Sequence, residues 1–129
     1  MTGVDHLSVG VPSIEDAEKF YDGVLETIGL ANLATTEGFA AYGTTAPAFL
    51  IMKPENGDVS SAGNGVHIAF AAKDRDAVDA FHAVALRLGG VCAGAPGPRP
   101  GYPKADVYAA FVRDPFGNKL EAIFNGFAA

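Results

Sequence analysis

The sequence predicts an α+β domain in which one order of strand and helix occurs twice. Two short stretches around His6 and His67 alternate apolar and polar residues, as half-buried strands do. Each is followed by a segment with apolar residues at helical spacing. With a shift of 61 residues (67 − 6), His67 falls on His6 and Phe81 falls on Phe20. These matches predict an internal repeat, and therefore two similar halves.

Length and composition fit one domain with a hydrophobic core, because 49% of the 129 residues are apolar. We expect a single domain over residues 1–129, with a first module at about 1–57 and a second at about 63–126. The net charge of −6 argues against nucleic acid or an anionic membrane and favours a small molecule or a protein as partner. No signal sequence or membrane span is evident, so we expect a cytoplasmic protein.

The first half reads as a strand, a helix and then short strands. The opening strand covers residues 4–9. Ser13 can cap the helix that follows, whose apolar residues recur at helical spacing until Gly29 ends it. Residues 30–52 contain two or three short strands separated by glycine-rich turns. The first half therefore predicts one helix among strands.

The second half restarts the same order after a polar, glycine-rich connection. A strand runs from His67 to about Ala72, and Asp74 can cap a second amphipathic helix. Gly89 and Gly90 stop that helix, and the repeat aligns the second of them with the glycine that ends the first helix.

The rest of the chain reads as a loop and a hairpin. Four prolines between Cys92 and Asp106 predict a loop rather than a helix or a central strand, and a loop of this length is often functional. Residues 107–113 and 119–124 then form two strands around a turn with proline and glycine at favourable positions. Whether the loop acts as a lid stays open.

Three side chains stand out chemically, because each lies on the strand face opposite the bulky apolar residues: His6, His67 and Glu121. Two imidazoles and one carboxylate match a facial triad with open coordination positions. Fe(II), Mn(II), Zn(II), Ni(II) or Co(II) would suit this set, and open positions are typical of a catalytic metal site. The alternative for each histidine alone is a residue of the core.

The sequence resembles the vicinal oxygen chelate superfamily, which includes glyoxalases, bleomycin-resistance proteins and extradiol dioxygenases. Residues 4–11, 14–30, 65–70 and 111–121 carry the resemblance, and the Asp-Pro-x-Gly-Asn turn before a strand glutamate is its most specific part. The resemblance implies two βαβββ modules that form a cupped, incomplete eight-stranded barrel around a metal. It also implies a homodimer, in some members with the site between subunits.

Carried over residue by residue, the resemblance makes His6 and His67 equivalent metal ligands of the two modules. It makes Glu121 the carboxylate ligand of the last strand, with a share in proton transfer. Leu50 stands at about the place of a fourth ligand. Glyoxalases have a glutamate there, so this departure puts glyoxalase activity itself in doubt.

The remaining candidate residues concern the substrate. Tyr102 is a candidate for hydrogen bonding to the substrate in catalysis. Strict alternation places Tyr108 on the opposite face from Phe111 and Arg113, so only one of these sets can line the pocket. The candidate pocket residues are Leu50, Met52, Tyr108, Phe111 and Arg113.

Several functions stay open. The first is a metal-dependent lyase, isomerase or oxygenase that acts on a small substrate chelating the metal through neighbouring oxygens. The second is a metal-independent binding protein of the bleomycin-resistance type. A thiol transferase of the fosfomycin-resistance type is a further alternative, although no basic cluster for a phosphonate is evident: Arg113 and Lys119 flank the turn, and Arg99 and Lys104 lie in the loop. The two histidines and the glutamate favour an enzyme.

Overall fold

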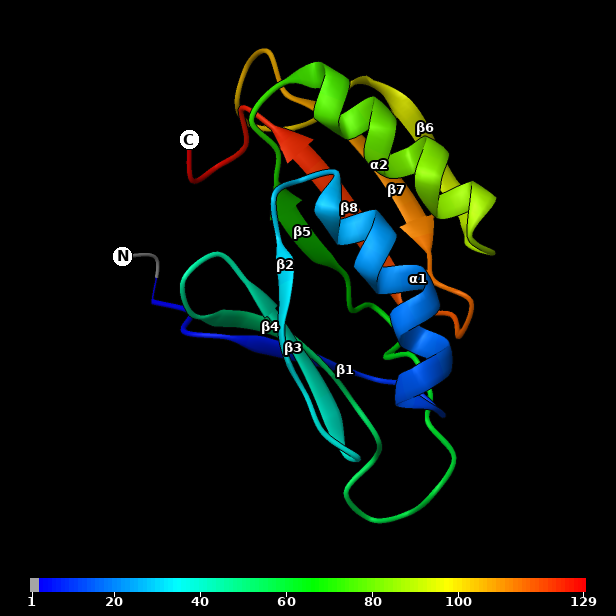
Figure 1. Ribbon diagram of the computed structural model, residues 1–129. Helices are drawn as coiled ribbons and strands as arrows, with labels where there is room; N and C mark the ends of the chain where they lie inside the picture. Colours follow the sequence, from blue (N-terminus) through cyan, green and yellow to red (C-terminus); the bar gives the residue numbers. More distant parts are fainter. Residues whose placement is uncertain (1–2) are drawn as a thin grey trace.

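The computed structural model describes residues 3–129 and contains two four-stranded mixed sheets, each with one helix (Figure 1). The elements are β1 (Leu7–Gly10), α1 (Ile14–Glu26), β2 (Ala31–Thr35), β3 (Phe39–Gly43), β4 (Pro47–Met52), β5 (Ile68–Ala71), α2 (Arg75–Arg87), β6 (Val91–Pro98), β7 (Tyr108–Arg113) and β8 (Lys119–Phe124). The first sheet has the order β1-β4-β3-β2, and the second has the order β5-β8-β7-β6. The pairs β1–β4 and β5–β8 are parallel, and all other neighbouring strands are antiparallel.

This topology confirms the predicted α+β fold with two βαβββ modules. Within residues 3–129 the two sheets do not close into a barrel. None of the described helices is long and apolar enough to cross a membrane.

The two helices begin in the same way. The Ser13 hydroxyl accepts the backbone N–H of Asp16 at 3.2 Å, and the Asp74 carboxylate accepts that of Ala77 at 2.8 Å. Both caps satisfy a backbone donor that has no partner within the helix. They are 61 residues apart (74 − 13), as the repeat predicts.

The helix ends correct the sequence alignment. Gly29 and Gly89 both have positive φ angles, of 84° and 102°, and both end their helix in the left-handed region. The next residue in each half, Leu30 or Gly90, donates its backbone N–H to the carbonyl five residues earlier. Gly89, rather than Gly90, is therefore the structural equivalent of Gly29.

One continuous core joins the two modules. The rings of Phe49 in β4 and Phe70 in β5 meet edge to face, with centroids 5.1 Å apart. Phe20 of α1 and Phe81 of α2, which the repeat aligns, are both fully buried in this core. The aromatic residues thus hold the two sheets and their helices together.

The proline-rich stretch departs from the prediction of a loop over residues 92–106. Its first part forms β6, which pairs with β7 through two register shifts. β6 is an edge strand, so its prolines need no partner on the outer side of the sheet. The segment between β6 and β7 is irregular and carries Tyr102.

Each helix covers one face of a sheet and leaves the other face uncovered. Helix α2 contacts β6, β7 and β8, whereas α1 contacts β2, β3 and β4 and packs against α2 (Figure 1). The uncovered face of the second sheet carries Glu121 and Phe111, which lie opposite each other on β8 and β7. The uncovered face of the first sheet carries Leu50 and Met52.

Candidate functional site

Glu121 lies at the centre of the second sheet, on β8 between β5 and β7. Its neighbours Leu120 and Ala122 point into the core, so alternation turns the Glu121 carboxylate to the uncovered face. The residue is only 1% exposed. A carboxylate buried to this degree requires polar partners.

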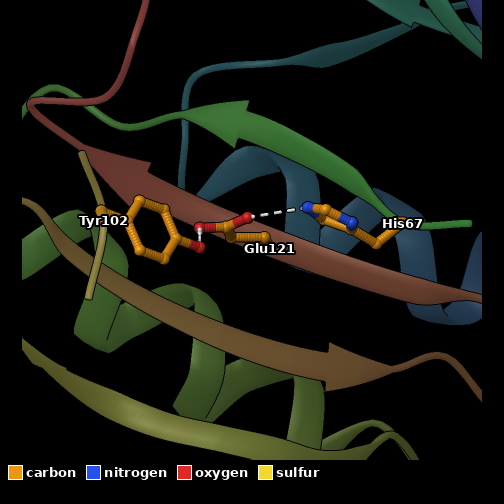
Figure 2. A network of polar contacts seen from close by, with 3 residues as sticks. All are labelled: His67, Tyr102 and Glu121. Atoms are coloured by element: carbon orange, nitrogen blue, oxygen red, sulfur yellow. Dashed lines mark hydrogen bonds and ion pairs between the residues drawn. The ribbon is translucent and has the colours of Figure 1, made fainter. Parts of the chain in front are cut away.

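Both Glu121 oxygens have such partners, from two other segments. His67 Nε2 lies 3.1 Å from Oε1, and the Tyr102 hydroxyl donates to Oε2 at 2.7 Å. Figure 2 shows the carboxylate between the tyrosine ring and the imidazole. Burial, the hydrogen bond to Glu121 and the charge of Glu121 raise the pKa of Tyr102 to about 12. Tyr102 is therefore a protonated donor at neutral pH.

A pocket of about 640 Å³ opens beside this group. His67, Tyr102 and Glu121 form its polar part. Small or apolar side chains and the segment after β8 form the rest, including Ala69, Ala71, Ile123 and Phe127. The pocket thus combines one polar group with an apolar wall, as small-molecule sites commonly do.

The two predicted histidine ligands occupy equivalent places but do not meet. Each lies one residue before its strand, His6 before β1 and His67 before β5, rather than within it. The His6 side chain is 59% exposed, and its Nδ1 lies 2.6 Å from the carboxylate of Asp5. Within residues 3–129, no three His, Cys, Asp or Glu side chains lie together as a metal site. One chain therefore brings together His67 and Glu121 but not His6.

The donor atoms at Glu121 suit a divalent metal in part. An imidazole nitrogen and a carboxylate oxygen, 3.1 Å apart, are two ligands of the right kind. The His67 side chain is 45% exposed, so it remains accessible from solvent. A third ligand would have to come from outside this pair.

The predicted pocket residues separate by face. The Phe111 ring lies beside the His67 ring, with centroids 5.9 Å apart. Arg113 lines a second pocket of about 370 Å³ together with His67. Tyr108 instead donates a hydrogen bond to Asp79 of α2 at 2.6 Å, on the helix side of the sheet. Only Phe111 and Arg113 of this strand therefore lie near the site.

Leu50 and Met52 lie on the other module. Both belong to β4, where they face away from the buried Phe49 and Ile51. In the register of the first sheet Leu50 pairs with Ser8, which has the same face as His6. They therefore lie with His6 on the first sheet and do not line the pocket around Glu121.

Several pocket residues were missed in the sequence. Strict alternation from His67 leads to Ala69 and Ala71, and alternation from Glu121 leads to Ile123. Alternation along the two strands therefore contained the signal for these three residues, because residues on one strand face line the same pocket. Phe127 follows the last strand and has no periodic signal.

A family model described as Glyoxalase/Bleomycin resistance protein/Dioxygenase superfamily matches residues 3–122. The chain belongs to this superfamily. The match spans both modules and confirms the resemblance inferred from the sequence motifs. A search of the curated proteins found no match.

Solved structures of the superfamily have the same fold. A glyoxalase/bleomycin resistance protein from Albidiferax ferrireducens T118 is 36% identical, with a TM-score of 0.85 over 95% of this chain and 98% of that one. A putative glyoxalase family protein from Bacillus anthracis is 27% identical, with a TM-score of 0.64 over 98% and 97%. A lactoylglutathione lyase from Agrobacterium tumefaciens, at 19% identity, has a TM-score of 0.67 over 97% and 95% and shows similarity of fold alone.

Proposed function

We propose that this protein is a divalent-metal-dependent enzyme, a lyase, isomerase or oxygenase, that acts on a small substrate through two neighbouring oxygens. The observation that carries the proposal is the buried Glu121 carboxylate with His67 at 3.1 Å in an open pocket. Burying a carboxylate in a pocket wall costs stability, and proteins commonly accept such a cost where the group has a function. Metal ligation is a task that fits both side chains.

The third ligand in this proposal is His6 of a second copy. His6 and His67 occupy equivalent positions at the start of equivalent strands, and each lies at an uncovered sheet face. In a two-fold symmetric dimer the same contact occurs twice, so two identical sites would form. Each site would take His67 and Glu121 from one chain and His6 from the other. The exposed Met52 and the half-exposed Leu50 beside His6 support an apolar contact of this kind.

The chain's own residues would then have separate tasks. When bound, the metal would supply Lewis-acid stabilisation of a developing negative charge on the substrate oxygens. Tyr102 holds Oε2 of Glu121 and so directs Oε1 towards His67. Glu121 would both ligate and accept a proton from the substrate. Leu50 provides no ligand, which argues against lactoylglutathione lyase activity despite the similar fold.

A metal-independent binding protein of the bleomycin-resistance type is the second candidate. The observation in its favour is that the described chain does not itself assemble three ligands. The largely apolar pocket would be sufficient for such a role. The metal content of the purified protein separates the two candidates.

The experiment uses protein purified without an affinity tag and compares His6→Ala, His67→Ala and a mixture of the two after subunit exchange. We expect the wild type to hold stoichiometric metal and each variant to lose it. In the mixture, half of the dimers are mixed and each has one intact site, so about a quarter of the wild-type metal should return.

His82→Ala is the matched control. His82 lies on α2, with Nε2 3.2 Å from Cys92 Sγ, and takes no part in the proposed site. It should leave the metal content unchanged. A wild type without metal supports the binding protein instead. Metal in the wild type without recovery in the mixture contradicts the shared site.

A further inference from the structure

Three cationic side chains gather around Phe111 on the uncovered face of the second sheet. Arg99 Cζ lies 5.5 Å and Lys119 Nζ lies 5.1 Å from the centroid of the Phe111 ring. Arg113 is the direct cross-strand neighbour of Lys119. In a chain with a net charge of −6, this is a local reversal of sign. The sequence did not reveal the cluster, because Arg99 reaches it from the segment after β6.

These charges have no counter-charge in direct contact among the described residues. Among residues 3–129, none of the three forms an ion pair with a carboxylate. Arg113 donates to the carbonyl of Gly117 at 2.8 Å, and Arg99 Nε is buried without a hydrogen-bond partner. Like charges on directly opposed strand residues destabilise a sheet. An anionic ligand would remove that cost.

The cluster lies next to the proposed reaction centre. His67 lines both the apolar pocket of about 640 Å³ and the pocket of about 370 Å³ that contains Arg113 and Lys119. Every second residue of β8 points to the uncovered face, so Lys119, Glu121 and Ile123 share it. Along the strand, a cation is therefore followed by the proposed reactive carboxylate and then by the apolar wall of the pocket. At a rise of about 3.3 Å per residue, the row from Lys119 to Ile123 spans about 13 Å.

We propose that the ligand of this site is an amphipathic organic anion. Its carboxylate- or phosphate-type group would lie at Arg113 and Lys119, with Arg99 adding positive potential. Its apolar body would lie against Ile123 and Phe127, and its middle would pass His67 and Glu121. This inference rests on the proposed function, because it takes the same His67–Glu121 centre as the place of reaction.

Other ligand classes fit less well. A neutral apolar molecule would leave the cations around Phe111 without counter-charge. A compact inorganic anion would leave the apolar wall of Ala69, Ala71 and Ile123 unused. An organic ligand with a cationic end at Arg113 and Lys119 would be repelled by the cluster. Only a ligand with one charged end and one apolar end uses both pockets.

The test measures binding of three probes to protein freed of metal with a chelator: hexylphosphonate, methylphosphonate and hexan-1-ol. Titrations followed by amide chemical shifts give the dissociation constants. We expect hexylphosphonate to bind at least about tenfold more tightly than either of the others, since only it gains from both ends. Its affinity should fall with added salt, because the cations are partly exposed.

Variants assign the two ends. Arg113→Gln and Lys119→Gln should each weaken hexylphosphonate binding by about threefold to fivefold, as expected for exposed charge pairs, and leave hexan-1-ol unaffected. Phe127→Ser removes part of the apolar wall. Phe127 is 69% exposed, so we expect the variant to fold. It should weaken both hexyl probes and spare methylphosphonate. Arg87→Gln on α2 makes the same charge change elsewhere and should alter none of them.

Equal affinity for hexylphosphonate and hexan-1-ol would overturn the inference, as would equal losses in Arg87→Gln and Arg113→Gln. Because the probes are measured without metal, this outcome is separate from the metal analysis. A protein that binds metal but shows no preference for the anion keeps the proposed function and loses this inference. A protein that prefers the anion but never binds metal keeps the ligand class as that of a binding protein.

Discussion

The Tyr102 hydroxyl donates to Oε2 of Glu121 at 2.7 Å and so ties the segment after β6 to the centre of β8. The two residues are far enough apart in the chain that only the fold brings them together. This bond occupies the carboxylate oxygen that does not face His67. It therefore orients a predicted ligand, as hydrogen bonds to metal-bound carboxylates do.

The first prediction removes this bond. Tyr102→Phe should lower metal affinity by about 10- to 100-fold, the usual effect of losing a hydrogen bond to a ligand. The ring contact with Phe127, at 5.7 Å between centroids, is kept, so the loss of stability should be limited to the hydrogen bond to buried Glu121, about 1–3 kcal/mol. Competition titration with a chromophoric chelator measures the affinity.

Tyr108→Phe is the control for this change. Tyr108 loses a hydrogen bond as well, but to Asp79 on the helix side of the sheet. Its metal affinity should match that of the wild type. An equal loss of metal affinity in the two variants would show that Tyr102 does not act by orienting Glu121.

Alternation along the strands predicted part of this site. Because Leu120 and Ala122 are apolar, the sequence alone placed Glu121 on the opposite face, and the structure has it there. The same reasoning placed Tyr108 opposite Phe111. Local periodicity determines the face of a residue, so these features could be read from the sequence.

The assembly of the site could not be read in this way. His6 and His67 follow the same local pattern, but their separation depends on how the two sheets are arranged in space. The gathering of Arg99 and Lys119 over Phe111 likewise depends on the path of an irregular segment. Neither the separation of the two histidines nor the position of the cations over Phe111 leaves a periodic signal in the sequence.

The second prediction concerns a buried hydrogen bond that joins the modules. The Tyr21 hydroxyl of α1 donates to Oδ2 of Asp114, in the turn before β8, at 2.5 Å. Tyr21→Phe should lower the free energy of unfolding at pH 7 by about 1–3 kcal/mol, because Asp114 loses a partner in a buried site. Urea denaturation measures the change.

The same pair predicts a pH dependence. Burial, followed by the nearby Asp114 charge, raises the pKa of Tyr21 well above its usual value near 10. The pKa of Tyr21 is higher in the folded state than in the unfolded state. The stabilisation that the Tyr21 hydroxyl gives to the folded state is therefore complete below about pH 10 and is lost as the pH rises towards the folded-state pKa. The difference in stability between wild type and Tyr21→Phe should therefore narrow at about pH 11. A constant difference at both pH values would contradict this.

The third prediction concerns the close approach of two backbone carbonyl groups and one aromatic ring to Gly90. A Cβ atom there would lie 2.9 Å from the carbonyl oxygens of Ala85 and Arg113 and 3.0 Å from Phe20. The backbone oxygens cannot move aside easily, so Gly90→Ala should destabilise the protein by about 1–3 kcal/mol. At Gly101 a Cβ would meet nothing within 4 Å, so Gly101→Ala should stay within about 0.5 kcal/mol of the wild type. Thermal unfolding of the pair provides the measurement, and equal melting temperatures would count against the crowding at Gly90.

The fourth prediction restores a ligand where the chain has none. Leu50 pairs with Ser8 in the parallel β1–β4 ladder and shares its face with His6, so Leu50→Glu would place a carboxylate on the face that carries that imidazole. If His6 joins the His67 and Glu121 of a second copy, metal affinity should rise by at least about tenfold. Met52→Glu puts the same charge one step further along that face, opposite Gly10, and should bring no gain. Titration of both variants with Zn(II) and Ni(II) measures the difference. A gain at both positions would indicate general attraction by added negative charge, whereas a gain at Leu50 alone supports a metal site on the face that carries His6.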